Sequence, residues 1–304
     1  MWDSLIIGSG PAGLGAAIYG KRAGLSVLVA EKEYMGTGQI AESGQVDNYL
    51  GLVGKSGYDL GEIFLEDAKK LGVEFYEGEA VAFEKKENSW SVSFENGEVV
   101  EAKTVIYGAG AKHRPLGLPE EADYAGKGIS YCAICDGAFY KKKVTAVIGG
   151  GDVAVEDAIF LAGLCEKVYL IHRRDSLRAA KSLQEKLFTL PNVELVWNAA
   201  VEEITGEAFV TGVQLLDTQT KEERFVAADG IFIAVGIQPV SESFKSLVKT
   251  DEAGYICAGE DCCTSVPGIF AVGDVRTKKL RQIVTAVADG ANAVNSVQEY
   301  FQTR

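Results

Sequence analysis

Apolar and polar residues follow the same order in two separate parts of the chain. In each part a short apolar run is followed by a glycine-rich segment, a helix-forming stretch and a second apolar run. Short apolar runs of this kind are typical of buried strands in a parallel sheet. The pattern therefore predicts two strand–helix–strand units, the second displaced by 141 residues, counted from Gly8 to Gly149. The predicted elements are residues 3–7, 14–23 and 27–30 in the first unit, and residues 144–148, a helix ending near residue 164 and residues 168–171 in the second.

A glycine-rich turn joins the first strand to the helix in each unit. Glycine allows the backbone to turn tightly and to approach a diphosphate, which the start of the following helix favours electrostatically. One such turn is weak support, but two with matched flanking elements predict two nucleotide sites. The alternative is that the glycines only let each helix pack on its strand. The candidate residues are Gly8, Gly10, Pro11, Ala12 and Gly13 in the first turn, and Gly149, Gly151, Asp152 and Ala154 in the second.

The residues that follow the second strand distinguish the two sites. Glu31 lies 23 residues after Gly8, and its carboxylate can accept hydrogen bonds from both hydroxyls of an adenine ribose. The same count from Gly149 reaches His172, and basic residues follow it. Guanidinium groups bind phosphate in a bidentate manner, so the first site favours FAD and the second NADPH. The alternative is a solvated helix start. The basic candidates are Arg173, Arg174 and Arg178, together with His172.

The last third of the chain adds a second group of candidate flavin residues. A strand-like segment at residues 230–235 precedes a turn at residues 236–239 that has a linker role, and the apolar run at residues 268–272 ends in Gly273 and Asp274. A carboxylate at a strand end can hold the hydroxyls of a ribityl chain. A helix beginning at Arg281, Gln282 and Ile283 and continuing to about residue 300 favours the partial negative charge of the flavin pyrimidine edge. A Gly-Asp pair alone is more often a plain turn.

Composition limits the possible functions. The chain has 304 residues, 47% of them hydrophobic, enough for a large core and about two domains. Its net charge of −13 argues against nucleic acid as a partner. No apolar stretch approaches the roughly 18 residues of a membrane span, and the strand at residues 3–7 leaves no room for a secretion signal. A cytoplasmic protein that does not enter a membrane is expected.

A cysteine pair lies 14 residues before the second glycine turn. Cys132 and Cys135 are separated by two residues and followed by Asp136. Such a pair can close a small disulfide ring, and a cysteine at a helix start has a stabilised thiolate. Half of a zinc site is the alternative, but no second pair has suitable spacing and the histidines are His113 and His172, so no metal is predicted. The other cysteines are predicted to be structural: Cys165 in the core, Cys257, Cys262 and Cys263.

Taken in order, these segments resemble the low-molecular-weight NADPH-dependent thioredoxin reductases across nearly the whole chain. The resemblance implies an α/β fold with two Rossmann-like dinucleotide-binding domains, the second inserted in the first. It implies an FAD-binding domain formed by residues 1–112 and 241–304, and an NADPH-binding domain at residues 113–240 that carries the cysteines. It adds Gly38, Gln39, Asn48 and Gly110 to the FAD candidates. The segments that carry it are residues 8–13, 38–39, 130–137, 149–154, 172–178, 273–274 and 281–283.

The resemblance also implies a reaction. Electrons would pass from NADPH to FAD, then to a Cys132–Cys135 disulfide and finally to thioredoxin. Cys135 would face the flavin, Cys132 would attack the thioredoxin disulfide and Asp136 would handle protons, although an isolated aspartate here could equally cap the helix. A homodimer is implied, as is a swing of the inserted domain about residues 110–115 and 236–239, because cysteines and nicotinamide on one domain both need the flavin.

Two alternatives use the same motifs. The first is a reductase of another small disulfide, or one that takes electrons from ferredoxin. Ferredoxin-fed relatives have lost the nucleotide motifs, whereas this chain retains both the glycine loop and the arginines. The second is a flavin-binding redox sensor without enzymatic activity. The preference of the protein for donor and acceptor distinguishes these possibilities.

Overall fold

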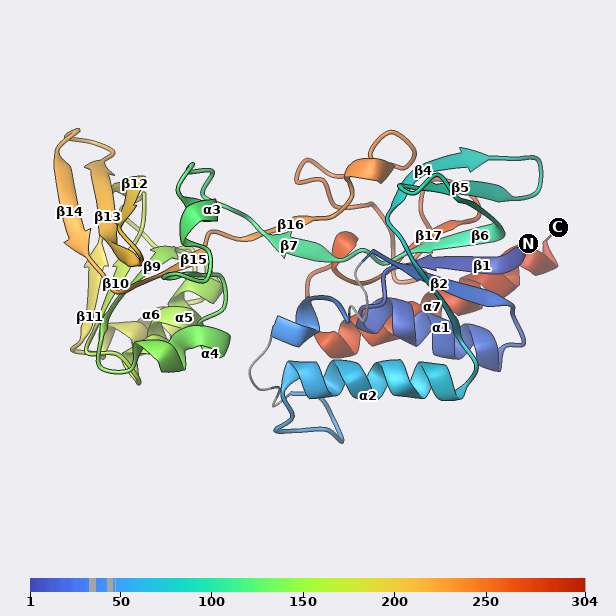
Figure 1. The fold of residues 1–304 in the computed structure, drawn as a ribbon, viewed down its shortest axis with the longest axis horizontal. Coiled ribbons are helices and arrows are strands. Elements are labelled where there is room, and N and C mark those ends of the chain that lie inside the picture. Colours follow the sequence, from blue (N-terminus) through green and yellow to red (C-terminus); the bar gives the residue numbers. More distant parts are fainter. Residues whose placement is uncertain (33–36, 43–45, 47, 304) are drawn as a thin grey trace. The chain divides into compact units, whose positions relative to one another are not determined.

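In a computed structural model the chain divides into two compact units (Figure 1). One unit is Met1–Lys112 with Gln238–Arg304, and the other is His113–Ile237, so the second is inserted in the first. The structure describes residues 1–32, 37–42, 46 and 48–303, without the side chains of Glu42 and Cys135. No helix in these ranges is long and apolar enough to cross a membrane.

The discontinuous unit is built on a mixed sheet whose strands run in the order β3-β2-β1-β6-β5-β4, with β17 paired to β6. The strands β1, β2, β3, β6 and β17 are parallel, and β4 and β5 are antiparallel. The strands are β1 (Trp2–Ile7), β2 (Val27–Glu31), β3 (Glu74–Glu77), β4 (Ala80–Lys85), β5 (Trp90–Phe94), β6 (Val99–Tyr107) and β17 (Ile269–Ala271). The helices are α1 (Pro11–Arg22), α2 (Gly57–Lys70) and α7 (Ile283–Gln302), with short 3₁₀ turns η1 (Gly38–Glu42), η3 (Glu242–Phe244) and η4 (Gly273–Val275).

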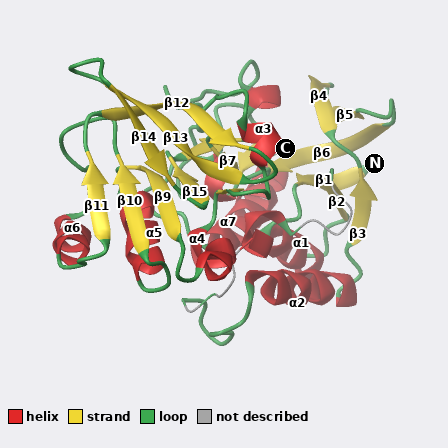
Figure 2. Ribbon diagram, turned by 60° about the vertical axis from the view of Figure 1, so that its left-hand side comes forward, coloured by secondary structure: helices red, strands yellow, loops and turns green. Residues whose placement is uncertain are grey.

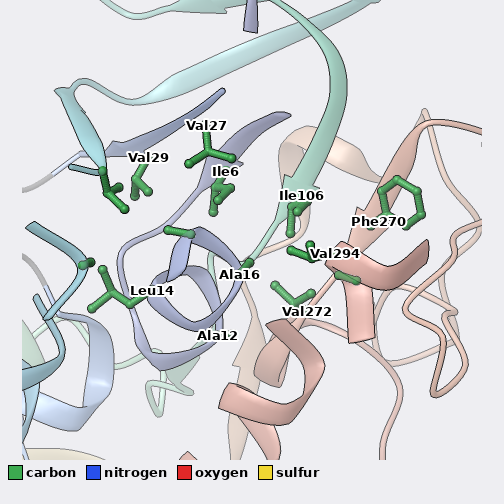
Figure 3. Packing of buried hydrophobic residues seen from close by; sticks show 14 of the residues in the cluster. Ile6, Ala12, Leu14, Ala16, Val27, Val29, Ile106, Phe270, Val272 and Val294 are labelled. Carbon is green, nitrogen blue, oxygen red and sulfur yellow. The ribbon is translucent and has the colours of Figure 1, made fainter. Parts of the chain in front are cut away.

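Alternation along the strands explains the two apolar layers of this sheet. Ile6 and Val29 face the helices α1, α2 and α7 and join their buried residues in one cluster (Figure 3). Their neighbours Leu5 and Leu28 face the other side, where they pack with Trp90 and other buried residues. Successive strand residues point to opposite faces, so a continuous apolar run is what a sheet covered on both sides requires.

The helices α1 and α7 touch along their small residues. A Cβ on Gly290 of α7 would lie 2.4 Å from the carbonyl oxygen of Ala12 and 2.5 Å from the backbone nitrogen of Ala16. Glycine at position 290 therefore lets the two backbones approach closely. The last helix of the chain is thus packed directly on the first.

The inserted unit has a parallel sheet with strands in the order β11-β10-β9-β15-β8 and an antiparallel sheet β12-β13-β14. Val147 of β9 packs with α5, whereas Ala146 and Ile148 pack with the antiparallel sheet, so each face of β9 is buried (Figure 2). The strands are β8 (Ile129–Ser130), β9 (Val144–Gly149), β10 (Lys167–Ile171), β11 (Val193–Val196), β12 (Ala199–Gly206), β13 (Val210–Asp217), β14 (Glu223–Ala227) and β15 (Gly230–Ala234). The helices are α3 (Glu121–Tyr124), α4 (Ala133–Asp136), α5 (Asp152–Ala162) and α6 (Lys181–Phe188), with the 3₁₀ turn η2 (Gly137–Tyr140).

Two short strands link the units and pair with each other: β7 (Ala111–His113) and β16 (Ile237–Pro239). The fold class predicted from the sequence is confirmed, and both strand–helix–strand units are present. The first helix begins at Pro11, three residues before the predicted start, because proline fits the first helical turn. The helix α5 ends at Ala162, two residues early, with Gly163 as its C-cap.

Candidate functional site

The first glycine loop has room only for glycine at two positions. Gly8 has a φ of +100°, and a Cβ on Gly13 would lie 1.9 Å from the carbonyl oxygen of Gly8. Glu31, at the end of β2, accepts hydrogen bonds from the N–H (2.8 Å) and Oγ (2.9 Å) of Ser9 through its Oε2. The loop, the start of α1 and the predicted ribose-binding carboxylate therefore lie together.

Three further candidate residues lie in the same unit, and one of them adjoins this loop. A Cβ on Gly38 would lie 3.2 Å from the Cα of Gly10, which places η1 against the loop. Asn48 donates its Nδ2 to the Oε1 of Gln282 at 2.8 Å. Gln282 is the N-cap of α7, and Ile283 is its first helical residue. The helix therefore begins two residues after Arg281, the first residue of the predicted helix. The structure thus brings Asn48 and Gln282 together from distant parts of the sequence.

The Gly-Asp turn η4 completes the group in the discontinuous unit. A Cβ on Gly273 would lie 2.9 Å from the Cβ of Ala12, so the turn packs on the start of α1. Within the described part of the chain, the buried Oδ1 of Asp274 and the buried Nε of Arg281 have no hydrogen-bond partner. The guanidinium of Arg281 lies 4.1 Å over the ring of Tyr255. Burial raises the pKa of Asp274. An unpaired buried acceptor needs a donor, and a ribityl hydroxyl is a suitable one.

These features fit FAD. Gly110 has a φ of +70°, and a Cβ built on it would meet open space among the described residues, while its carbonyl oxygen accepts the N–H of Val240 at 3.0 Å. A dinucleotide with a polyol chain requires glycine positions without side chains, a carboxylate at the end of β2 and a buried acceptor that lacks a donor. Of the predicted flavin residues, the structure brings together Gly8, Gly10, Gly13, Glu31, Gly38 and Gly273 around the first loop and the start of α1, and the binding role of every candidate stays a prediction.

The second glycine loop is equally crowded. A Cβ on Gly149 would lie 2.3 Å from the carbonyl oxygen of Ala234, and a Cβ on Gly150 would lie 2.3 Å from the imidazole of His172. The Oδ1 of Asp152 accepts the N–H of Ala180, the N-cap residue of α6, at 2.7 Å. The side chain of Asp152 thus has a structural partner within its own unit.

His172 lies beneath this loop rather than on its surface. Its side chain is buried, and its Nε2 has no hydrogen-bond partner in the described part of the chain. Burial, followed by the charge of Arg178, lowers the pKa of His172, so the imidazole is neutral near pH 7. The N–H of Arg178 donates to the carbonyl oxygen of Gly150 at 2.7 Å, while Arg173, Arg174 and Arg178 are exposed. The positive charge beside the loop therefore comes from the arginines. These features fit a nucleotide with a ribose phosphate.

The cysteine pair lies in the inserted unit, directly after β8. Cys132 is half-buried and disulfide-bonded. Its N–H donates to the Oγ of Ser130 at 3.0 Å, and its carbonyl oxygen accepts the N–H of Asp136 at 3.1 Å. Cys132 therefore immediately precedes the short helix α4. The side chain of Cys135 lies outside the described part of the structure, so its predicted pairing stays a prediction.

The other four cysteines are free. Cys165 and Cys262 are buried and Cys263 is exposed. Burial raises the pKa of Cys262 to about 12, which leaves its thiol protonated and unreactive at neutral pH. The prediction that Cys165 belongs to the core is confirmed. Within the described ranges, no three histidine, cysteine or acidic side chains form a group able to hold a metal ion.

A buried glutamate beside the cysteine segment was not predicted. Glu121 is 7% exposed, and its carboxylate accepts the N–H groups of Leu116 (3.0 Å), Gly117 (2.5 Å) and Leu118 (2.8 Å). It also accepts the hydroxyl of Tyr131 at 2.9 Å, and burial, followed by this hydrogen bond, raises the pKa of Tyr131 to about 12. The one signal in the sequence is an acid that follows a Gly-Leu-Pro turn. Glu121 therefore ties the segment after β7 to the residue before Cys132.

A second unpredicted acid lies on α5. Burial, followed by the charge of Glu156, raises the pKa of Asp157 to about 7, and His113 opposes the shift. Nothing in the sequence distinguishes this aspartate from a solvated helix residue. Its carboxyl group is the one acid in the described ranges whose pKa is raised close to neutrality.

Comparison with known proteins supports the assignment. The family model for pyridine nucleotide-disulphide oxidoreductases matches residues 2–290. Thioredoxin reductases from Listeria monocytogenes (42% identical over 99% of this chain and 94% of the relative) and Bacillus subtilis (44% over 99% and 95%) are similar in sequence. The crystal structure of Lactococcus lactis thioredoxin reductase in its FR conformation is similar in fold, with a TM-score of 0.87, 38% identity and full coverage of both chains. The chain therefore belongs to the pyridine nucleotide-disulphide oxidoreductase family and, within it, to the thioredoxin reductases.

Proposed function

We propose that this chain is an NADPH-dependent thioredoxin reductase in which electrons from NADPH reach thioredoxin through FAD and a Cys132–Cys135 disulfide. The observation that carries the proposal is the disulfide-bonded Cys132, which lies in the same compact unit as the second glycine loop. The match to thioredoxin reductases over 99% of the chain supports it. When bound, FAD would accept a hydride equivalent from NADPH and deliver two electrons to the disulfide.

The discontinuous unit would hold FAD. The loop at residues 8–13 would accommodate the diphosphate, and Glu31 would accept the adenine ribose hydroxyls. Asp274 would accept a ribityl hydroxyl through the buried Oδ1, for which the described residues provide no hydrogen-bond partner. The residues proposed to bind FAD are Gly8, Gly10, Pro11, Ala12, Gly13, Glu31, Gly38, Gln39, Asn48, Gly110, Gly273, Asp274, Arg281, Gln282 and Ile283.

The inserted unit would hold NADPH. The loop at residues 149–154 would accommodate the diphosphate, and Arg173, Arg174 and Arg178 would bind the 2′-phosphate. His172 would support the loop from beneath as a neutral side chain. Substituting Arg173 and Arg174 by alanine should raise the dissociation constant for NADPH at least tenfold and that for NADH less than threefold, because each charged hydrogen bond contributes about 1.5–3 kcal/mol. Equal losses for both nucleotides, measured by fluorescence titration, would contradict the assignment.

The thiol chemistry is carried by three residues. After reduction of the pair, the Cys132 thiolate would attack one sulfur of the thioredoxin disulfide and form a mixed disulfide. Cys135 would then attack the Cys132 sulfur, which re-forms the internal disulfide and releases thioredoxin with both sulfurs reduced. Asp136, which is half-buried, would supply the proton that the departing thiolate needs.

The test is anaerobic mixing of the flavin-loaded protein with NADPH in a stopped-flow spectrometer. Fast loss of the flavin absorbance and its recovery on addition of oxidised thioredoxin are expected. Substituting Cys132 by serine should abolish the recovery, whereas Cys263→Ser, at an exposed free cysteine, should leave it unchanged. Absence of bleaching would point to another electron donor, such as ferredoxin, and bleaching without recovery to another disulfide acceptor or a sensor.

We further propose that the protein acts in the cytoplasm as a homodimer. The support is its resemblance to the thioredoxin reductases and its free buried cysteines, which suit a reducing compartment. Light scattering coupled to size-exclusion chromatography should give a mass near 65 kDa, twice the chain mass of 32.5 kDa. A monomer mass over the micromolar range would contradict the dimer.

A further inference from the structure

A buried carboxylate in α7 gathers several donors. Asp289 is 3% exposed. Its Oδ2 accepts Nε of Arg276 (2.8 Å), Nζ of Lys278 (2.7 Å) and the N–H of Gly273 (2.8 Å), and its Oδ1 accepts Nη2 of Arg276 (2.5 Å). Both oxygens thus accept hydrogen bonds from within the protein.

The two cations around this carboxylate are also buried. The side chains of Arg276 and Lys278 are 8% and 6% exposed. Nη1 of Arg276 donates to the carbonyl oxygens of Ala258 (3.3 Å) and Thr277 (3.0 Å). Buried ionic groups are costly to desolvate, and apolar side chains of similar volume often give equal or greater stability. Stability alone therefore does not explain why three charged side chains occupy this site.

The hydrogen bond to Gly273 shows what the group holds in place. The φ of Gly273 is +72°, and a Cβ there would lie 2.9 Å from the Cβ of Ala12. The next residue, Asp274, carries the buried Oδ1 without a partner. Asp289 is thus hydrogen-bonded to the turn that contains Asp274. This bond joins the turn to α7, the helix that packs on α1.

We propose that Asp289 is a positioning residue for the flavin: by accepting the Gly273 N–H while paired with Arg276 and Lys278, it fixes the turn η4 so that Asp274 meets the ribityl chain. The inference rests on the proposed binding of FAD by the discontinuous unit. Asp289 makes no contact with the flavin in this account and acts through Gly273 and Asp274 alone.

The experiment separates positioning from simple stabilisation. The single variant Asp289→Leu leaves two buried cations unpaired, and the triple variant Asp289→Leu, Arg276→Met, Lys278→Met removes the charges together. Each apoprotein is tested for thermal unfolding and titrated with FAD by quenching of flavin fluorescence. The single variant should lose both unfolding temperature and FAD affinity. The triple variant should regain the unfolding temperature to within a few degrees but keep an FAD dissociation constant at least tenfold above that of the wild type, since the Gly273 N–H still lacks its acceptor.

A triple variant that binds FAD as tightly as the wild type would overturn the inference. If the triple variant does not fold, the double variant Asp289→Leu, Lys278→Met keeps the net charge of the group and still removes the acceptor of the Gly273 N–H. Its FAD dissociation constant should rise severalfold, and a wild-type value would likewise overturn the inference.

A matched control lies on the same helix. Glu299 is exposed and pairs with Asn295, so Glu299→Gln makes the carboxylate-to-amide change away from η4 and should leave both measurements unchanged. A wild-type apoprotein that binds no FAD would overturn the proposed function together with this inference. Wild-type binding combined with an unaffected triple variant would overturn this inference alone.

Discussion

Glu121 shows how one buried side chain can fix a long irregular segment. Its carboxylate accepts three backbone N–H groups and the Tyr131 hydroxyl while being 7% exposed. The substitution Glu121→Gln keeps the shape but replaces one acceptor oxygen with a donor that faces N–H groups. The free energy of unfolding should fall by about 2 kcal/mol, the typical value for hydrogen bonds to a charged group. Urea unfolding measures this loss.

The control for this prediction lies on the same short helix. Asp123 is exposed, so Asp123→Asn should change the free energy of unfolding by less than about 0.5 kcal/mol. Equal stability of Glu121→Gln and the wild type would show that water can replace the carboxylate. Tyr131→Phe, which removes one of the four donors, should fall between these two variants.

Asp157 gives the inserted unit a dependence of stability on pH. Burial raises its pKa from the ordinary value of 3.8 to about 7, so the folded state binds this proton more tightly than the unfolded state. Its contribution to stability is therefore complete below pH 4 and is lost as the pH rises from about 4 to 7. Asp157→Asn should remove this decline and stabilise the protein at pH 8, by up to about 3 kcal/mol.

The measurement is urea unfolding at several pH values between 5 and 8. The exposed Glu166, which follows α5, provides the control Glu166→Gln, whose pH profile should match that of the wild type. An Asp157→Asn profile parallel to the wild type would show that this carboxyl group is already ionised at pH 5.

Side chains whose position follows from their spacing along the sequence could be predicted. Side chains whose role depends on burial in the folded chain could not. Glu31 follows a fixed count from Gly8, and its carboxylate accepts the N–H of Ser9 in that loop. Among the basic residues after β10, Arg178 donates its backbone N–H to Gly150 of the second loop. The buried position of His172 beneath Gly150 depends on three-dimensional packing. The same holds for Asp289, which is 16 residues from Gly273 and reaches it only because α7 folds back on η4.

At the scale of elements, the contact between α1 and α7 depends on one missing side chain. The substitution Gly290→Ala would place a Cβ 2.4 Å from the Ala12 carbonyl oxygen. Neither backbone can move without disturbing the sheet, so the free energy of unfolding should fall by about 3 kcal/mol, the upper end for overpacking. Because Ala12 opens the helix that follows the first glycine loop, retention of FAD during gel filtration should fall as well.

The control for this prediction is an exposed position of α7. Asn295→Ala truncates a solvent-facing side chain and should cost less than about 0.5 kcal/mol. Gly290→Ala with the stability of the wild type would mean that the two helices can separate by several tenths of an ångström without loss.

Strands formed by continuous apolar runs could be predicted well. The strands β1, β2, β9 and β10 are apolar runs between glycine-rich turns, and each was expected within a residue or two of its position. The antiparallel sheet β12-β13-β14 was not predicted, because its buried and exposed residues follow no regular alternation and charged side chains are frequent. Such a pattern carries a weaker signal than a run buried on both faces.

At the scale of the whole molecule, the proposed reaction requires the inserted unit to bring cysteines and nicotinamide to the flavin in turn. Gly236, just before β16, has a φ of +114° and no atom within 4 Å of a Cβ built on it. A side chain at this position would therefore meet no steric obstacle, but the backbone, whose carbonyl oxygen accepts the N–H of Arg114, has a conformation that favours glycine. Gly236→Ala should lower turnover about tenfold by restricting this linker, while leaving the dissociation constant for NADPH unchanged.

Steady-state turnover with thioredoxin and equilibrium titration with NADPH separate the two effects. A proportional loss of NADPH affinity would instead indicate damage to the inserted unit. The insertion itself was expected from the resemblance to thioredoxin reductases. The pairing of β7 with β16 was not, because two three-residue strands give no recognisable pattern.

The insertion also affects how the protein is made. The core beneath the first sheet needs Phe270, Val272 and the buried residues of α7, which a ribosome delivers last. Until then the part of α1 that packs on α7 has no cover, whereas the inserted unit has all of its own strands. The first-synthesised unit is therefore the last to complete its core, and during that interval it is the part that chaperones must protect from aggregation.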